Sequence, residues 1–298
     1  MAATRPDTST WAPVWEAAGR PVCVGVDGSW RNRAAIDWAL RQADATARPL
    51  DLVGAVPVHD QAGAGIDEHH WASLDELAAR LRRLRPEVAI RRVLSAGGAV
   101  PCLLARSSES ALLVVGKRGA GTFSRLLLGS TSVGVAARSM VPVAIVPDIW
   151  HQEEHEGQPV MVGLDPYDVP RDAMQWAFAQ ARRRGVELLA VHAFSLPALA
   201  GWDLGVAPFS YAELAGESQE ALTKVMAEYA AENPDVPVRT EQHRGHPADV
   251  LLREAGSAQV LVLGRQPGHF KGFPWGSVAR GVLHYAELPV VLVPAPAA

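Results

Sequence analysis

The chain has 298 residues, of which 48% are hydrophobic and 20% charged, a composition typical of a folded protein with a sizeable core. Its formal net charge of −4 argues against a nucleic-acid-binding surface, and no apolar run is long enough to span a bilayer. The two cysteines, Cys23 and Cys102, are too few for a disulfide framework or a thiolate metal cage, so we expect a protein of the reducing cytoplasm.

The chain is a tandem repeat. The segment 21–56, beginning PVCVGVDGSW, is similar to 159–194, beginning PVMVGLDPYD, with Asp27 and Asp165 in register. Near the ends of the halves, GSTSVGVAARSMVPVAIVP corresponds to GSVARGVLHYAELPVVLVP. The duplication predicts two related domains. We expect a tail, a first domain, a polar linker and a second domain over residues 1–18, 19–148, 149–157 and 158–296.

Short apolar runs alternate with helical patterns along the first half. The runs are rich in Val and Leu, as in parallel strands buried on both faces, and they cover 22–26, 50–56, 111–116 and 141–147. Helical spacing of apolar residues occupies 33–47, 99–110 and 131–139. Strands that alternate with helices predict a doubly wound α/β sheet in each half.

An arginine-rich stretch covers residues 80–92. Leu77, Leu81 and Leu84 have helical spacing there, which indicates a core-facing stripe with the arginines on a solvated outer face. We expect this face to be solvated rather than to bind nucleic acid.

A segment rich in glycine and hydroxyl residues follows the strand at 111–116. Glycines permit close approach of main-chain N–H groups to a ligand, and a helix that opens with hydroxyl side chains is typical of an anion site. Asp27, followed by Gly28 and Ser29, ends another strand at the same edge of the sheet, where doubly wound folds bind ligands. The candidate residues in this segment are Gly116, Lys117, Gly119, Gly121, Gly129, Ser130, Thr131 and Ser132. Glycines that only form turns and helix caps are the alternative interpretation.

Two familiar phosphate-binding motifs are absent from the sequence. There is no G-x-x-x-x-G-K-[ST] motif, so the chain is not a P-loop NTPase. The first strand leads into DGSWRN and not into G-x-G-x-x-G, so a dinucleotide site is unsupported.

The pattern G-x-x-G-x9-G-S from Gly116 to Ser130, followed by PVAIVP, resembles the nucleotide signature of the universal stress protein family. VGVDGSWRNRAAIDWAL resembles that family's first strand and helix. The resemblance covers both halves. It implies two tandem α/β domains, Rossmann-like or flavodoxin-like, each with a five-stranded parallel sheet in the order 3-2-1-4-5.

The same resemblance implies that the chain binds ATP, with Mg²⁺ or Mn²⁺ bridging the phosphates. Asp27 would approach the ribose and phosphates, the backbone around Ala55 would meet adenine, and the glycine segment would hold the phosphates. A related adenine nucleotide such as cyclic AMP is an alternative ligand. Domains of this family pair through their last strands, so we expect 143–146 and 290–293 to pair, within one chain or between the chains of a homodimer.

The second half departs from the pattern. Pro267 stands where the middle glycine is expected, the loop is one residue shorter, and Pro166 replaces a small flexible residue. Since proline offers no N–H to a phosphate, we expect weaker binding here. The corresponding candidate residues are Asp165, Ala193, Gly264, Gly268, Gly276 and Ser277.

The sequence favours an ATP-binding stress-response regulator. Slow ATP hydrolysis and a nucleotide-free scaffold are the alternatives. Dedicated catalysis is not predicted, because Asp27 is the one obvious base and no motif fixes a set of catalytic residues. The paired histidines lie in expected loops or the linker without thiolates, so we expect solvated side chains and not metal ligands. These pairs are His69 with His70, His151 with His155, and His243 with His246.

Overall fold

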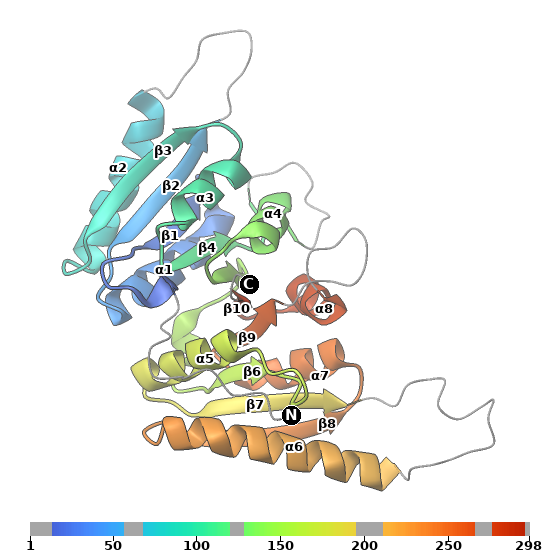
Figure 1. Ribbon diagram of the computed structural model, residues 1–298. Helices are drawn as coiled ribbons and strands as arrows, with labels where there is room; N and C mark the ends of the chain where they lie inside the picture. Colours follow the sequence, from blue (N-terminus) through green and yellow to red (C-terminus); the bar gives the residue numbers. More distant parts are fainter. Residues whose placement is uncertain (1–13, 57–67, 120–127, 195–210, 266–275, 296–298) are drawn as a thin grey trace.

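The computed structural model describes residues 14–56, 68–119, 128–194, 211–265 and 276–295. The strands of this part of the chain form one sheet of ten, in the order β3-β2-β1-β4-β5-β10-β9-β6-β7-β8 (Figure 1). Their bounds are β1 (Val22–Val26), β2 (Leu50–Val56), β3 (Ile90–Ala96), β4 (Leu112–Gly116), β5 (Val143–Val146), β6 (Val160–Gly163), β7 (Leu188–Phe194), β8 (Val238–Arg244), β9 (Val260–Arg265) and β10 (Val290–Pro294).

Helices connect the strands. The α-helices are α1 (Arg33–Ala45), α2 (Glu68–Leu84), α3 (Ala99–Ser107), α4 (Ser130–Arg138), α5 (Arg171–Arg184), α6 (Tyr211–Glu232), α7 (Pro247–Glu254) and α8 (Ser277–Tyr285). Short 3-10 turns are η1 (Val14–Glu16), η2 (Trp30–Asn32), η3 (Gln152–His155) and η4 (Ala255–Ser257). No helix among the described residues is long and apolar enough to cross a membrane.

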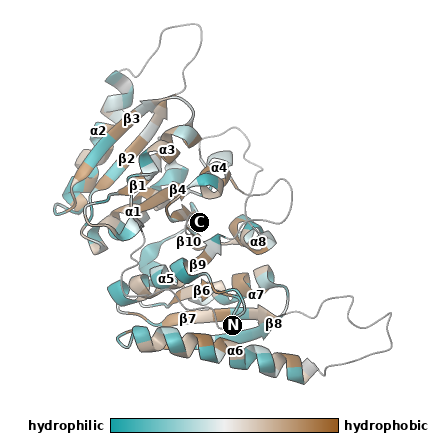
Figure 2. Cartoon of the chain, viewed as in Figure 1, coloured by the Kyte–Doolittle hydropathy of each residue, from teal (hydrophilic) through white to brown (hydrophobic). Residues whose placement is uncertain are grey.

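Each half of the sheet has the predicted topology. The five strands of a half run parallel, and both halves have the order 3-2-1-4-5, counted along their own sequence. In the first half α1 packs on β1 and β4, α2 packs on β2 and β3, and α3 packs against α4. The central strands are covered on both faces, and their residues are accordingly mostly hydrophobic. Figure 2 shows this concentration of hydrophobic residues along the strands.

The two halves join through their last strands within one chain. β5 and β10 are antiparallel neighbours, with Ala144 opposite Val291, and every residue of both strands is buried. The expected pairing is therefore intramolecular. Because each of these strands has neighbours on both sides, neither offers a free edge to a second chain, and the sheet ends at β3 and β8.

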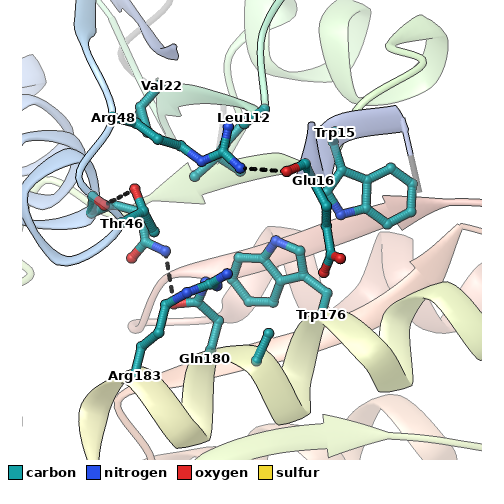
Figure 3. Close-up of a pocket in the computed structure, with 12 residues that line it drawn as sticks. Trp15, Glu16, Val22, Thr46, Arg48, Leu112, Trp176, Gln180 and Arg183 are labelled. Carbon is teal, nitrogen blue, oxygen red and sulfur yellow. Dashed lines mark hydrogen bonds between the residues drawn. The ribbon is translucent and has the colours of Figure 1, made fainter. Parts of the chain in front are cut away.

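Helices α1 and α5 meet at the junction of the halves. Gln42 Nε2 donates a hydrogen bond of 2.7 Å to Gln180 Oε1, and both side chains are buried. The repeat makes these two glutamines equivalent, since 180 − 42 = 138, the separation of Asp27 and Asp165. Figure 3 shows the small pocket beside this bond, flanked by Trp15 and Trp176. A pseudo-two-fold axis thus passes close to the glutamine pair.

Several elements differ from the sequence predictions. Leu81 is fully buried as expected, but Leu84 ends α2 and is 53% exposed. The end of the arginine-rich stretch forms the start of β3, an edge strand. In the expected linker, Trp150 is buried and stacks on His155 with ring centroids 3.9 Å apart. Both cysteines are free and buried.

Candidate functional site

Two loops meet at the carboxyl ends of β1 and β4. Asp27 Oδ1 accepts a hydrogen bond of 2.9 Å from the Ser29 N–H, which closes a turn, and Gly28 has φ +74°, a conformation that favours glycine. A Cβ atom at Gly119 would lie 2.5 Å from Asp27 Oδ2, so a larger residue would require the Asp27 carboxylate to move. The structure thus brings together two of the predicted ligand residues, Asp27 and Gly119.

The neck of the glycine loop is tied by hydrogen bonds. Gly129 N–H donates to the Lys117 carbonyl at 2.9 Å, and Lys117 N–H donates to the Val146 carbonyl at 2.7 Å. Ser132 is buried and its Oγ donates to the Gly116 carbonyl at 2.7 Å. The Ser132 hydroxyl therefore supports the loop from within. Gly121 lies outside the described residues.

The amino-terminal end of α4 faces the same crevice edge. Gly129 is the N-cap residue of α4 and has an extended backbone conformation. Because glycine has no side chain, no N-cap side chain covers this end of the helix. Ser130 is exposed and Thr131 half-buried, so both hydroxyls lie near the surface. The first N–H groups of a helix have no intrahelical acceptor and carry the positive end of the helix dipole. This end of α4 is suited to an anion.

The two basic residues of the loop are engaged elsewhere, which sequence reasoning missed. Lys117 Nζ donates to the carbonyl of Ala286 in the second half at 2.8 Å, and Arg118 Nη2 lies 2.8 Å from Asp148 Oδ1. Burial, and then the neighbouring Arg118, lower the pKa of the Lys117 ammonium to about 8. Lys117 serves the domain junction in this structure.

Ala55 and Ala193 lie near the carboxyl ends of β2 and β7, where the resemblance places adenine. Both are half-buried. The residue before each differs between the halves: Gly54 in the first, His192 in the second. His192 is 7% exposed, and its Nδ1 lies 3.0 Å from the Leu164 carbonyl oxygen. An imidazole thus occupies this place in the second half.

The second half keeps part of the site. Asp165 Oδ1 accepts a hydrogen bond of 3.0 Å from the Tyr167 N–H, so the turn after β6 forms despite Pro166. Gly276 is the N-cap of α8 and Ser277 is exposed, as at α4. Gly268 and Pro267 lie outside the described residues.

The floor of the crevice differs between the halves at a pair that sequence reasoning missed. A Cβ atom at Gly264 would collide with the Pro170 ring, so this proline packs directly on the end of β9. The equivalent of Pro170 in the first half is Asn32, since 170 − 138 = 32. A Cβ at Gly116 would lie 3.4 Å from Asn32 Nδ2. An amide therefore lies beside the end of β4 in the first half, where a proline packs on the end of β9 in the second.

A cluster of possible metal ligands lies away from the crevice. His243 is on β8 and not in the expected loop, with Nε2 3.0 Å from Glu241 Oε2 and 3.7 Å from Glu254 Oε1. Both carboxylates also pair with arginines, Glu241 with Arg239 and Glu254 with Arg253. These arginines already compensate the acidic charge.

Comparison with known proteins gives a consistent result. The sequence model of the Universal stress protein family matches residues 19–147 and again residues 157–294. The universal stress protein Rv2005c of Mycobacterium tuberculosis (strain ATCC 25618 / H37Rv) is 32% identical over 295 residues, covering 91% of this chain and 96% of that protein.

A solved structure shows the same fold over most of the chain. A universal stress protein from Archaeoglobus fulgidus DSM 4304 superimposes with a TM-score of 0.63 at 21% identity, covering 92% of this chain and 96% of that one. A shorter universal stress protein, solved in complex with cAMP, is 32% identical and covers 44% of this chain and 99% of its own, with a TM-score of 0.36. The cAMP is the ligand of that other protein in its own structure.

Proposed function

The chain belongs to the universal stress protein family, with two family domains in tandem, and we propose that its first domain binds ATP as a stress-response regulator. The observation that carries this proposal is the convergence of Asp27, Gly119 and the amino-terminal end of α4 at one edge of the sheet. Such an edge, outside the carboxyl ends of parallel strands, is the usual ligand site of doubly wound folds.

The phosphates belong at the end of α4. Its free N–H groups and the hydroxyls of Ser130 and Thr131 supply hydrogen-bond donors, and Gly129 lets the chain approach without a side chain. The tied neck between Lys117 and Gly129 holds these donors in place before the ligand arrives, which lowers the ordering cost of binding.

In this arrangement the Asp27 carboxylate lies beside the phosphates, where a cation would relieve the repulsion between the negative charges. One carboxylate with adjacent phosphate oxygens fits Mg²⁺ or Mn²⁺, since such ions bind through one or two carboxylates together with substrate phosphates. Asp27 would then hold the ion or its waters. Ribose hydroxyls are the other suitable donors to Asp27 Oδ2.

We propose a regulatory and not a catalytic role. Asp27 is the single carboxylate among the proposed ligand residues of the first domain. Both cations of the loop are engaged by the protein, Lys117 with the Ala286 carbonyl across the domain junction and Arg118 with Asp148. ATP would act by favouring one arrangement of the chain over another, to the extent that it binds the two with different affinity. In the second domain Pro170 packs on Gly264 and Pro267 replaces the middle glycine, so we expect this domain to serve mainly as a partner for the first.

Calorimetric titration of the full chain with ATP and Mg²⁺ tests the proposal. We expect one site per chain, lost in Gly119→Val because the new side chain meets Asp27 Oδ2. Gly216→Ala on α6, where a Cβ meets open space, is the matched control and should keep the site. No binding by the unaltered chain would overturn the proposal. Phosphate release above background in the same samples would replace the regulator with a slow ATPase.

A further inference from the structure

Asn32 is a buried amide that the fold does not use. It is 4% exposed, lies at the amino-terminal end of α1, and its Oδ1 has no hydrogen-bond partner. Its side chain makes no hydrogen bond to the rest of the described chain. Leaving a buried polar group unpaired is costly, and natural proteins rarely do so without a reason.

Three structural explanations for this side chain fail. Asn32 is the N-cap residue of α1, yet its side chain makes no capping hydrogen bond. The neighbouring turn is closed instead by Asp27 and the Ser29 N–H. The main-chain N–H of Asn32 bonds to the Ser29 carbonyl at 3.2 Å, but any residue except proline provides that bond.

The position of the amide points to a ligand. Its Nδ2 lies close to Gly116, at the neck of the candidate phosphate loop, and Asp27 ends the strand that precedes it. An amide offers donors that phosphate oxygens accept and an acceptor that a hydroxyl satisfies. Both kinds of group are present on a nucleotide.

The second domain supports this reading by contrast. Pro170, at the equivalent position, packs its ring against Gly264 and has neither an amide nor an N–H. Hence the orphan amide occurs in the half whose glycine signature is complete. It is missing from the half that lacks the middle glycine.

We propose that Asn32 is a ligand-binding residue of the first crevice, whose Nδ2 donates to a phosphate oxygen and whose Oδ1 accepts from a hydroxyl of the bound nucleotide. The proposal rests on the function proposed above. The bound nucleotide would thus supply the hydrogen-bond partners that the described part of the chain does not offer to this amide.

Two substitutions separate this role from a structural one. Asn32→Leu keeps the volume and removes the unpaired group, so we expect a higher unfolding temperature together with an affinity for ATP lower by about tenfold. Asn32→Asp keeps the shape but adds a negative charge, so its loss of affinity should grow from adenosine through AMP and ADP to ATP.

A matched control lies on the same helix. Gln42 is also a buried amide, 3% exposed, but it is hydrogen-bonded to Gln180. Gln42→Leu should lower the unfolding temperature and leave ATP affinity unchanged. Binding would be measured by titration with the four ligands at fixed Mg²⁺, and stability by thermal unfolding of the same samples.

The outcomes distinguish the two proposals. If the unaltered chain binds none of the four ligands, the proposed function itself falls. If it binds ATP and Asn32→Leu binds equally well, the nucleotide site stands and the role of Asn32 is refuted. A variant that loses stability and weakens adenosine and ATP alike would also refute it, because that is the behaviour of a structural residue.

Discussion

Lys117 Nζ donates a hydrogen bond of 2.8 Å to the carbonyl of Ala286, across the junction of the two domains. Arg265, the equivalent residue of the second domain since 265 − 148 = 117, donates from Nη1 to the Ala136 carbonyl at 3.0 Å. Both acceptors lie at the carboxyl ends of helices, α8 and α4, that begin at the candidate phosphate loops. Cations stabilise such ends by satisfying free carbonyls and opposing the helix dipole.

Replacing Lys117 should therefore affect folding more than binding. Lys117→Met keeps the apolar stem and removes the donor to Ala286, so we expect a loss of about 1–2 kcal/mol in the free energy of unfolding. Urea unfolding measures it, with Lys224→Met on the exposed face of α6 as control. Loss of ATP binding at unchanged stability would show that the ammonium reaches the ligand, as the sequence alone suggested.

Asp172 should make stability depend on pH. It is 3% exposed, neither carboxylate oxygen has a hydrogen-bond partner, and burial raises the pKa of this carboxyl to about 6. The folded chain thus binds this proton more tightly than the unfolded chain, whose pKa is 3.8. The resulting stabilisation is present below pH 4 and is lost as the pH rises through about 6.

The variant Asp172→Asn should flatten that dependence. At pH 7.5 we expect it to be more stable than the unaltered chain, by at most about 3 kcal/mol. Unfolding in urea at pH 4.5, 6 and 7.5 gives the comparison. Asp249→Asn, in the exposed first turn of α7, is the control and should leave the slope unchanged. Parallel curves for the Asp172 variant and the unaltered chain would contradict the prediction.

Asp51 should be among the most sensitive positions of the first domain. It is wholly buried on β2, with Oδ1 2.7 Å from Arg91 Nε and Oδ2 2.7 Å from Arg106 Nε. Asp51→Ala removes the buried carboxylate that both arginines contact. Because Arg91 and Arg106 are partly exposed and Arg106 also pairs with Glu109, we expect a loss of about 1.5–3 kcal/mol. The exposed pair of Asp44 with Arg85 gives the contrast, and Asp44→Ala should cost less than about 1 kcal/mol. Chemical unfolding of both variants tests the ranking, and equal losses would refute it.

The two halves should remain together when the connection between them is cut. β5 and β10 are buried neighbours, and Gln42 and Gln180 join α1 to α5, so the contact does not depend on chain continuity. A protease site inserted beside the exposed Glu154 allows the cut. We expect the fragments to elute as one species in size-exclusion chromatography. Separate elution under native conditions would show that the junction is too weak to hold on its own.

Much of the architecture could be predicted because local patterns of apolar residues indicate the strands and helices. The segments that form β1, β2 and β4 are short runs rich in Val and Leu, and the duplication repeats the pattern in the second half. The approach of Asp27 to Gly119 also followed from the rule that parallel strands end at one edge. The intrachain pairing of the last strands was one of two open alternatives.

What could not be predicted depends on distant contacts. Lys117 finds its acceptor 169 residues away, so no local pattern indicates where its ammonium points. β3 was obscured because Arg91 and Arg92, at an exposed sheet edge, extend an arginine-rich helix in the sequence. The contrast of Asn32 with Pro170 was visible in the repeat, yet only the packing against Gly116 and Gly264 gave it a meaning.

The meeting of β5 with β10 inside one chain has a consequence for how such a protein changes over generations. In a pair of identical chains, any substitution appears on both sides of the shared boundary, so a loss of binding is a loss in both sites. Here each half always faces the other half and never a copy of itself. One domain can therefore lose its ligand site and remain as a structural partner, while the other domain keeps its own site.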